Sequence, residues 1–185
     1  CIRDRSSVSI DDEKAGETIV DYLIEHGHTK IAEIGANLEL SQTARLRHNG
    51  YLNSLKKHGI TPDERYYERA RFSYDSAYRA MKKLLEKDIE ITAVYAISDV
   101  MAIGALRAIL DKGLRVPEDI SITGFDGSTL AEYYNPKIVS IRQPHKDMAA
   151  RSVELLFNMI DLHKGSCHEI ISFELTEGES VARID

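Results

Sequence analysis

Residues 91–126, ITAVYAISDVMAIGALRAILDKGLRVPEDISITGFD, decide the fold of this chain. The apolar run 91–97 predicts a short buried strand, and Ser98 or Asp99 is a typical cap for the helix that follows. Gly113 ends that helix, and Pro117 prevents it from resuming before another strand begins at 120–123. The segment therefore predicts a strand, a helix and a second strand in close succession.

The same alternation extends to both sides of this segment. We expect further helices at 12–26, 43–58, 73–85 and 129–133, and further strands at 30–34, 66–70 and 138–142. Strands that alternate with helices favour parallel pairing, because each helix returns the chain to the same end of the sheet. The predicted fold class is α/β, a doubly wound parallel sheet flanked by helices.

The pattern changes after Gln143 and Pro144. One long amphipathic helix is expected over about 145–163, followed by strands at about 168–175 and 180–184. The dipeptide Glu177-Gly178 between these strands is typical of a hairpin turn. We therefore expect the C-terminal stretch to be an appendage of the main domain.

Length and composition limit the class of protein. The chain has 185 residues, 43% of them hydrophobic, and a formal net charge of −6. That suffices for one good core, and an acidic chain binds nucleic acid poorly because neutralising phosphates requires an excess of Lys and Arg. No apolar run approaches the roughly 18 residues of a membrane-spanning helix, and two distant cysteines, Cys1 and Cys167, indicate reduced thiols. Because the sequence starts with Cys rather than Met, we expect a fragment or a processed product.

Open α/β sheets bind ligands outside the carboxyl ends of their strands, so the residues that follow each strand are candidates. They include hydroxyls, an amide, carboxylates, guanidinium groups and an aromatic ring. This set suits a polyhydroxylated ligand, because a sugar needs paired donors and acceptors and a ring to stack on. The candidate segments are 35–43 with Arg45 and Arg47, Phe72, Ser98-Asp99, 125–127 and Arg142-Gln143.

Each candidate also has a structural alternative that the sequence leaves open. Arg47 could be a solvated helix position, and Phe72 could belong to the core. Asp126 could cap the short helix after it, Ser98 and Asp99 could serve the start of helix 99–112, and Gln143 could merely end a strand. Their shared place on one edge of one sheet favours the functional interpretation.

Motifs typical of enzymes are missing from the sequence, which has no G-x-S-x-G, no G-x-x-x-x-G-K-[ST], no H-E-x-x-H and no C-x-x-C. No G-x-G-x-x-G follows a strand either. The seven histidines lie at expected helix ends or exposed positions, and we expect His26 and His28 to serve the end of the first helix. The sequence therefore predicts no enzyme, no metal site and no cofactor.

Six segments, in order along residues 8–144, resemble one family, the LacI/GalR transcription regulators. They are YLIEHGHTKI at 22–31, TARLRHNGY at 43–51, FSYDSAY at 72–78, SDVMAIGA at 98–105, VPEDISITGFD at 116–126 and VSIRQP at 139–144. The remaining tail resembles the family more loosely. Two details depart from its pattern: Ser98 stands where many sugar-binding members have Asn, and no second acidic residue follows Asp126.

The resemblance implies a two-lobed, periplasmic-binding-protein-like effector domain with its ligand between the lobes. Residues 11–143 would form the C-terminal lobe, 1–10 a remnant of the N-terminal lobe and crossover, and 144–185 the return segment to that lobe with its final strand. The rest of the N-terminal lobe and the helix-turn-helix head would be absent from this chain. Matched by position, the ligand-binding residues implied are Thr43, Arg47, Phe72, Ser98, Asp126 and Gln143, with Asp4 as a further polar residue at a lobe crossover.

The resemblance also implies a function, that of a cytoplasmic repressor which binds operator DNA as a homodimer and responds to a small sugar. A galactoside is the first candidate effector and a purine the second. Dimer contacts would lie on helix 99–112 and around 130–134, although Tyr133 and Tyr134 could instead pack locally. The alternatives are a secreted sugar-binding protein of a transport system, which the VPEDIS block at 116–121 disfavours, and an enzyme. We expect Arg47→Ala to weaken effector binding at least about tenfold without unfolding the domain.

Overall fold

The structure is a computed structural model that describes residues 6–161 and 167–184 of the chain. Its main sheet has six strands in the order β3-β2-β4-β5-β6-β8. These are β2 (Ile31–Gly35), β3 (Tyr67–Arg69), β4 (Ala93–Ala96), β5 (Ser121–Asp126), β6 (Val139–Arg142) and β8 (Glu174–Thr176). All neighbours pair in parallel except β8, which is antiparallel to β6. The predicted fold class is confirmed.

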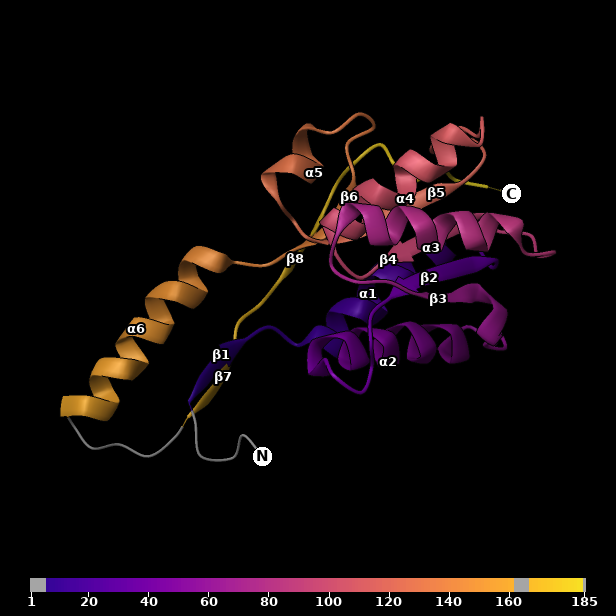
Figure 1. Cartoon of the computed structure of the whole chain (residues 1–185). Helices are drawn as coiled ribbons and strands as arrows, with labels where there is room; N and C mark the ends of the chain where they lie inside the picture. Colours follow the sequence, from indigo (N-terminus) through magenta and orange to yellow (C-terminus); the bar gives the residue numbers. More distant parts are fainter. Residues whose placement is uncertain (1–5, 162–166, 185) are drawn as a thin grey trace.

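Helices cover both faces of this sheet (Figure 1). The helices α1 (Asp12–Glu25) and α2 (Gln42–Lys57) pack together on one face, and α3 (Tyr74–Glu86) and α4 (Asp99–Asp111) pack together on the other. Each begins where the sequence places a cap, because the side chain of Asp11, Ser41, Ser73 or Ser98 accepts a backbone N–H three residues further on. Shorter elements are the 3-10 helix η1 (Glu64–Tyr66) and helix α5 (Thr129–Tyr133).

The strand order reverses at β2, and this reversal positions the site. The chain leaves β2 through α2 to reach β3 on one side, then crosses through α3 to β4 on the other side of β2. The loops after β2 and β4 therefore run in opposite directions from the carboxyl ends of these two strands. Such a switch point is where open α/β sheets bind their ligands.

Glycines let the two helices on each face approach closely. A Cβ atom on Gly50 of α2 would lie 2.2 Å from the carbonyl oxygen of Glu13 in α1. On the other face, a Cβ atom on Gly104 of α4 would lie 2.2 Å from the carbonyl oxygen of Tyr74 in α3. Both contacts are to backbone atoms, so a larger residue would push the helices apart.

The C-terminal stretch differs from the prediction. Helix α6 (His145–Asp161) extends away from the main body, next to a small parallel sheet of β1 (Ser7–Ser9) and β7 (His168–Ile170) (Figure 1). The expected strand 168–175 is thus two strands, β7 and β8, in different sheets. Residues 180–184 form no strand, so the predicted hairpin at Glu177-Gly178 is wrong.

The last described residues lie against the main lobe instead of leaving it. The Ser180 hydroxyl donates to the Ile122 carbonyl at 2.6 Å, and the Ile184 N–H donates to the His26 carbonyl at 2.9 Å. Residues 174–184 are therefore bound to the main sheet and its flank, whereas helix α6 of the expected return segment 144–185 extends away from it. Within the described ranges, no helix combines the length and the apolar character needed to cross a membrane.

Candidate functional site

Arg47 lies at the strand-order reversal, beside the carboxyl ends of β4 and β5. Its side chain is only 5% exposed, and its Nη1 donates to the carbonyl oxygen of Ile97, just after β4, at 2.6 Å. Its Nε donates to Asp12 Oδ1 at 2.8 Å, and its guanidinium carbon lies 3.5 Å from the centroid of the Phe125 ring. A buried guanidinium needs such partners to offset its lost hydration. The alternative that Arg47 is a solvated helix position is wrong.

Asp126 ends β5 beside Arg47. Its Oδ1 lies 3.5 Å from Arg47 Nη1 and accepts a hydrogen bond of 2.7 Å from Gln143 Nε2. The backbone φ of Asp126 is +114°, a conformation that costs energy in a residue with a side chain and is found mostly at functional sites. Burial raises the pKa of this carboxyl group; the charge of Asp99 acts in the same direction, and the guanidinium of Arg47 acts against it. Asp126 does not cap α5, because Ser128 does.

Gln143 follows β6 and completes a connected set with Arg47 and Asp126. Besides the side-chain bond, its N–H donates to the Asp126 carbonyl at 3.2 Å. A third of the Asp126 side chain stays exposed, so this edge presents an acceptor to the outside. A guanidinium, a carboxylate and an amide held in fixed positions can donate to and accept from the hydroxyls of one small molecule.

Ser98 and Asp99 serve the scaffold around this edge. Ser98 is buried and caps α4 through a 3.3 Å bond from the Met101 N–H. Asp99 Oδ1 accepts from the Ser140 hydroxyl, and its Oδ2 accepts from the Ser128 N–H, each at 2.6 Å. Burial raises the pKa of Asp99, although these hydrogen bonds oppose the shift. Asp99 thus ties the loop that follows β5 to strand β6.

Thr43 and Phe72 lie on the same edge with fewer contacts. Thr43 is half-buried in the first turn of α2. Phe72, in the loop before α3, is 50% exposed, so its interpretation as a core residue is wrong. A role of these two in binding stays a prediction, and Asp4 lies outside the described residues.

Asp12 belongs to this cluster and was missed by sequence reasoning. It lies in the first turn of α1, where an acidic residue is expected for its effect on the helix dipole alone. The residue that it binds, Arg47, is 35 positions further along the chain. Nothing in the local pattern could have indicated that pair.

The side chains of two histidines are more buried than expected, and His163 lies outside the described residues. His28 is 1% exposed and contacts Thr92 Oγ1 at 3.1 Å and the Ala182 carbonyl at 3.0 Å. Half-buried His48 lies 2.6 Å from the fully buried Glu33. His26 does end α1 as expected. Across the described residues, no cluster of three or more His, Cys, Asp or Glu side chains could hold a metal ion.

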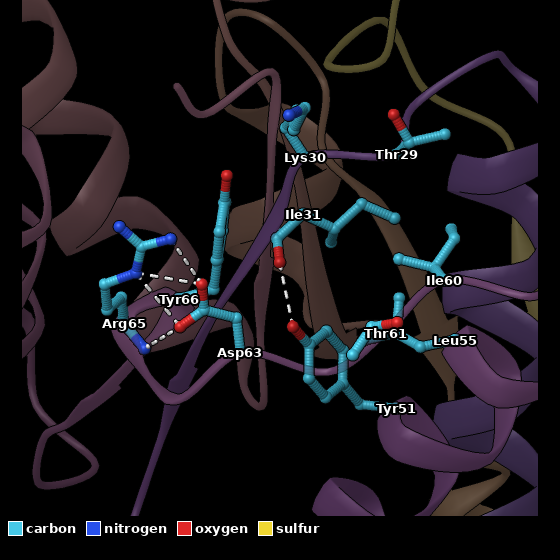
Figure 2. Close-up of a pocket in the computed structure, with 10 residues that line it drawn as sticks. All are labelled: Thr29, Lys30, Ile31, Tyr51, Leu55, Ile60, Thr61, Asp63, Arg65 and Tyr66. Carbon is cyan, nitrogen blue, oxygen red and sulfur yellow. Dashed lines mark hydrogen bonds and ion pairs between the residues drawn. The ribbon is translucent and has the colours of Figure 1, made fainter. Parts of the chain in front are cut away.

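A separate cavity of about 350 Å³ lies at the amino ends of the strands (Figure 2). It is bounded by the start of β2 at Lys30 and Ile31, by Tyr51 of α2 and by segment 60–66. Figure 2 shows the Tyr51 hydroxyl bonded to the Ile31 carbonyl, which anchors α2 to β2. This position is at the edge opposite Arg47 and away from the strand ends where the fold binds ligands.

Comparisons with known proteins connect this geometry to a family. The family described as periplasmic binding protein-like domain matches residues 20–181. The transcriptional regulator MalR of Clostridium butyricum is 41% identical over 97% of this chain and 53% of its own length. The transcriptional repressor CytR of Escherichia coli K12 is 36% identical over 91% of this chain and 50% of its own. The chain thus spans about half the length of the curated relatives it matches.

Solved structures give the same result. A complex of the transcriptional regulator CelR with cellobiose matches with a TM-score of 0.91 and 34% identity, over 96% of this chain and 54% of that one. A LacI-family regulator from Enterococcus faecium with bound ribose matches with a TM-score of 0.87 and 26% identity, over 97% and 66%. Each of these relatives is named as a regulator of transcription.

Proposed function

Because this chain belongs to the periplasmic binding protein-like domain family, as the effector-binding portion of a LacI-type transcription regulator, we propose that it binds a small sugar at the carboxyl edge of its sheet. In a repressor, binding of the sugar would change the affinity of the protein for operator DNA. The resemblance found in the sequence is confirmed, and the prediction that the chain is not an enzyme is confirmed as well.

The observation that carries the proposal is the anchored Arg47 at the switch point. Its guanidinium is fixed by Ile97, Asp12 and the Phe125 ring of the chain itself, and it lies beside Asp126. A sugar hydroxyl both donates and accepts, so neighbouring guanidinium and carboxylate groups can bind one hydroxyl or an adjacent pair. Pre-positioned partners also reduce the entropy lost on binding.

A sugar is favoured over other ligands by the relatives as well as by the chemistry. The structures of CelR and of the Enterococcus faecium regulator contain cellobiose and ribose, respectively. The exposed ring of Phe72 supplies a stacking surface for a pyranose, but it would serve a purine equally well. A purine-responsive regulator is therefore the second candidate, and a galactoside remains one candidate among sugars.

Asp12 and the strands β1 and β7 would couple ligand binding in this lobe to DNA binding. Asp12 begins α1 just after β1, and β1 pairs with β7 in the small sheet beside α6. A ligand that forms hydrogen bonds with Arg47 would weaken the bond between Arg47 and Asp12. That change would reach β1, which directly precedes α1. Such coupling requires that the ligand bind one arrangement of the regulator more tightly than another.

The proposal includes a homodimer that acts in the cytoplasm. The contact surface would comprise α4 and α5, where Leu130 is 47% and Tyr133 82% exposed. Local packing does not account for Tyr133 at that exposure, although Tyr134 does pack partly against the core. Large exposed apolar side chains are typical of subunit contacts.

The test is thermal melting of the complete protein that carries this chain. The panel should contain galactosides, glucosides such as cellobiose, pentoses such as ribose, and purine bases. A ligand that binds only the folded state raises the midpoint of unfolding. A shift with one class of sugar supports the proposal, a shift with a purine alone supports the second candidate, and no shift contradicts both.

A further inference from the structure

A second cavity lies between α2 and the connection that follows it, next to the first cavity, with which it shares Tyr51 and Asp63 as lining residues. Its volume is about 610 Å³, which is within the range of small-molecule sites. Its walls include the aromatic rings of Tyr51 and Tyr67 and the apolar side chains of Leu52 and Pro62. Leu38 of the candidate segment 35–43 lines it, but none of the six residues matched by position as ligand-binding does.

One residue in the wall of this cavity, His48, is paired with a buried carboxyl group behind it. Glu33, which is fully buried, accepts a 2.6 Å hydrogen bond from His48 Nδ1, and the His48 ring lies in the cavity wall. The other carboxylate oxygen of Glu33 has no hydrogen-bond partner among the described residues. Replacing a buried ion pair by apolar residues of similar volume is often neutral or stabilising. Stability of the fold therefore does not explain why this position carries a Glu–His pair.

The electrostatics of His48 favour its charged form. Burial alone would lower the pKa of the imidazole, but the hydrogen bond and the charge of Glu33 outweigh burial and raise it. A protonated ring uses Nδ1 for Glu33 and keeps the Nε2 N–H as a donor for something else. Groups with shifted pKa values in the wall of a cavity are candidates for a binding function.

We infer that this cavity is a second ligand site, and that it takes a small planar aromatic acid. The rings of His48, Tyr51 and Tyr67 form its aromatic wall, with the His48 ring centroid 5.2 Å from that of Tyr67 and 6.2 Å from that of Tyr51. An aromatic ligand packs against such a wall, and its carboxylate accepts from His48 Nε2.

Lys56 supplies a second positive charge. It is an exposed residue of α2 whose side chain lines the same cavity. Of the two acidic side chains that line the cavity, Asp63 is bound to Arg65 at 2.7 Å. The exposed carboxylate of Glu64 is the remaining one and opposes an anionic ligand, so the acid group is expected on the side of His48 and Lys56.

The probe for this site is 2-naphthoate, with the neutral 2-naphthamide as its matched control. The chain has no tryptophan, so naphthoate fluorescence anisotropy can be followed without interference from the protein. We expect the full chain to bind naphthoate at least about tenfold more tightly than naphthamide, because only the former forms a charge-assisted hydrogen bond with His48. Equal affinities for the two probes would overturn the inference.

Variants locate the binding. Lys56→Glu should weaken naphthoate binding about tenfold by charge reversal, whereas Lys83→Glu, the same change at an exposed position of α3, should not alter it. Leu52→Phe should reduce the volume of the cavity and weaken naphthoate binding without adding a tryptophan. Gln143→Ala, at the carboxyl edge, should leave binding unchanged. Loss of binding with Gln143→Ala, or equal binding by wild type and Lys56→Glu, would contradict a separate site.

Discussion

Arg47 is the residue on which the site depends most. Its guanidinium satisfies two carboxylates and one carbonyl in a place where water has little access. Removing it would leave Asp12 and Asp126 with unbalanced negative charge near the carboxyl ends of β4 and β5. The sequence suggested that Arg47→Ala would spare the fold, but its burial in the structure argues otherwise.

We therefore expect Arg47→Ala to lower the free energy of unfolding by about 3 kcal/mol, the cost of breaking a buried ion pair by removing one partner. The exposed neighbour Arg45 on the same helix is the matched control, since Arg45→Ala should change stability by less than about 0.5 kcal/mol. Urea unfolding followed by circular dichroism measures both. Equal stability of the two variants would show that Arg47 is more solvated than the 4% exposure of the whole residue indicates.

The Glu33–His48 pair predicts a pH dependence of stability. The pKa values of Glu33 and His48 are both higher in the folded state than in the unfolded chain. Above pH 6.5, the ordinary pKa of histidine, the folded state therefore binds more protons than the unfolded chain. The stabilisation from His48 is complete below pH 6.5 and is lost as pH rises through its folded-state pKa. The raised pKa of Glu33 likewise makes the folded state less stable as pH rises.

The measurement is the free energy of unfolding between about pH 6 and 9. Wild type should lose stability across this interval, and both His48→Gln and Glu33→Gln should reduce the slope. His28 gives the opposite sign at lower pH, because burial lowers its pKa and stability is lost as pH falls below 6.5. An unchanged slope in both variants would contradict the assignment to this pair.

Among the elements, the helix pairs depend on glycine at their closest approach. A Gly→Ala change in the middle of a helix ordinarily stabilises by up to about 1 kcal/mol. We expect the opposite for Gly50→Ala and Gly104→Ala, a loss of about 2 kcal/mol each, because the new methyl group would meet a backbone oxygen at 2.2 Å. Thermal and urea unfolding test this, with Lys83→Ala as an exposed helical control; stabilised glycine variants would refute it.

The elements also show what a sequence can and cannot reveal. The starts of α2, α3 and α4 were predictable, because a capping serine and the helical period act within a few residues. The division of 168–175 into two strands was not predictable from the sequence. It depends on distant pairings, because β7 pairs with Ser7–Ser9 near the start of the chain and β8 pairs with β6. In the site, the sheet edge predicted Arg47, Asp126 and Gln143, but their link to Asp12 depends on contacts that no local pattern encodes.

At the scale of the whole molecule, the exposed apolar surface of α4 and α5 predicts self-association. Tyr133→Asp and Leu130→Asp should shift the complete protein toward monomer, because a charge at the centre of an apolar contact opposes its burial. Leu40→Asp is the control, since Leu40 is 85% exposed but lies on a different part of the surface, before α2. Sedimentation velocity distinguishes these outcomes, and an unchanged dimer fraction in both variants would place the contact elsewhere.

The account as a whole depends on a sugar being bound through the carboxyl edge of the sheet. The most direct measurement is calorimetric titration of the sugar that raises the melting point into wild type, Asp126→Asn and Asp75→Asn. Asn keeps the shape of Asp126 and tolerates its backbone conformation, so only the charge is lost. We predict at least about tenfold weaker binding for Asp126→Asn and no change for Asp75→Asn on the exposed start of α3. Equal affinity of all three folded proteins would contradict the account.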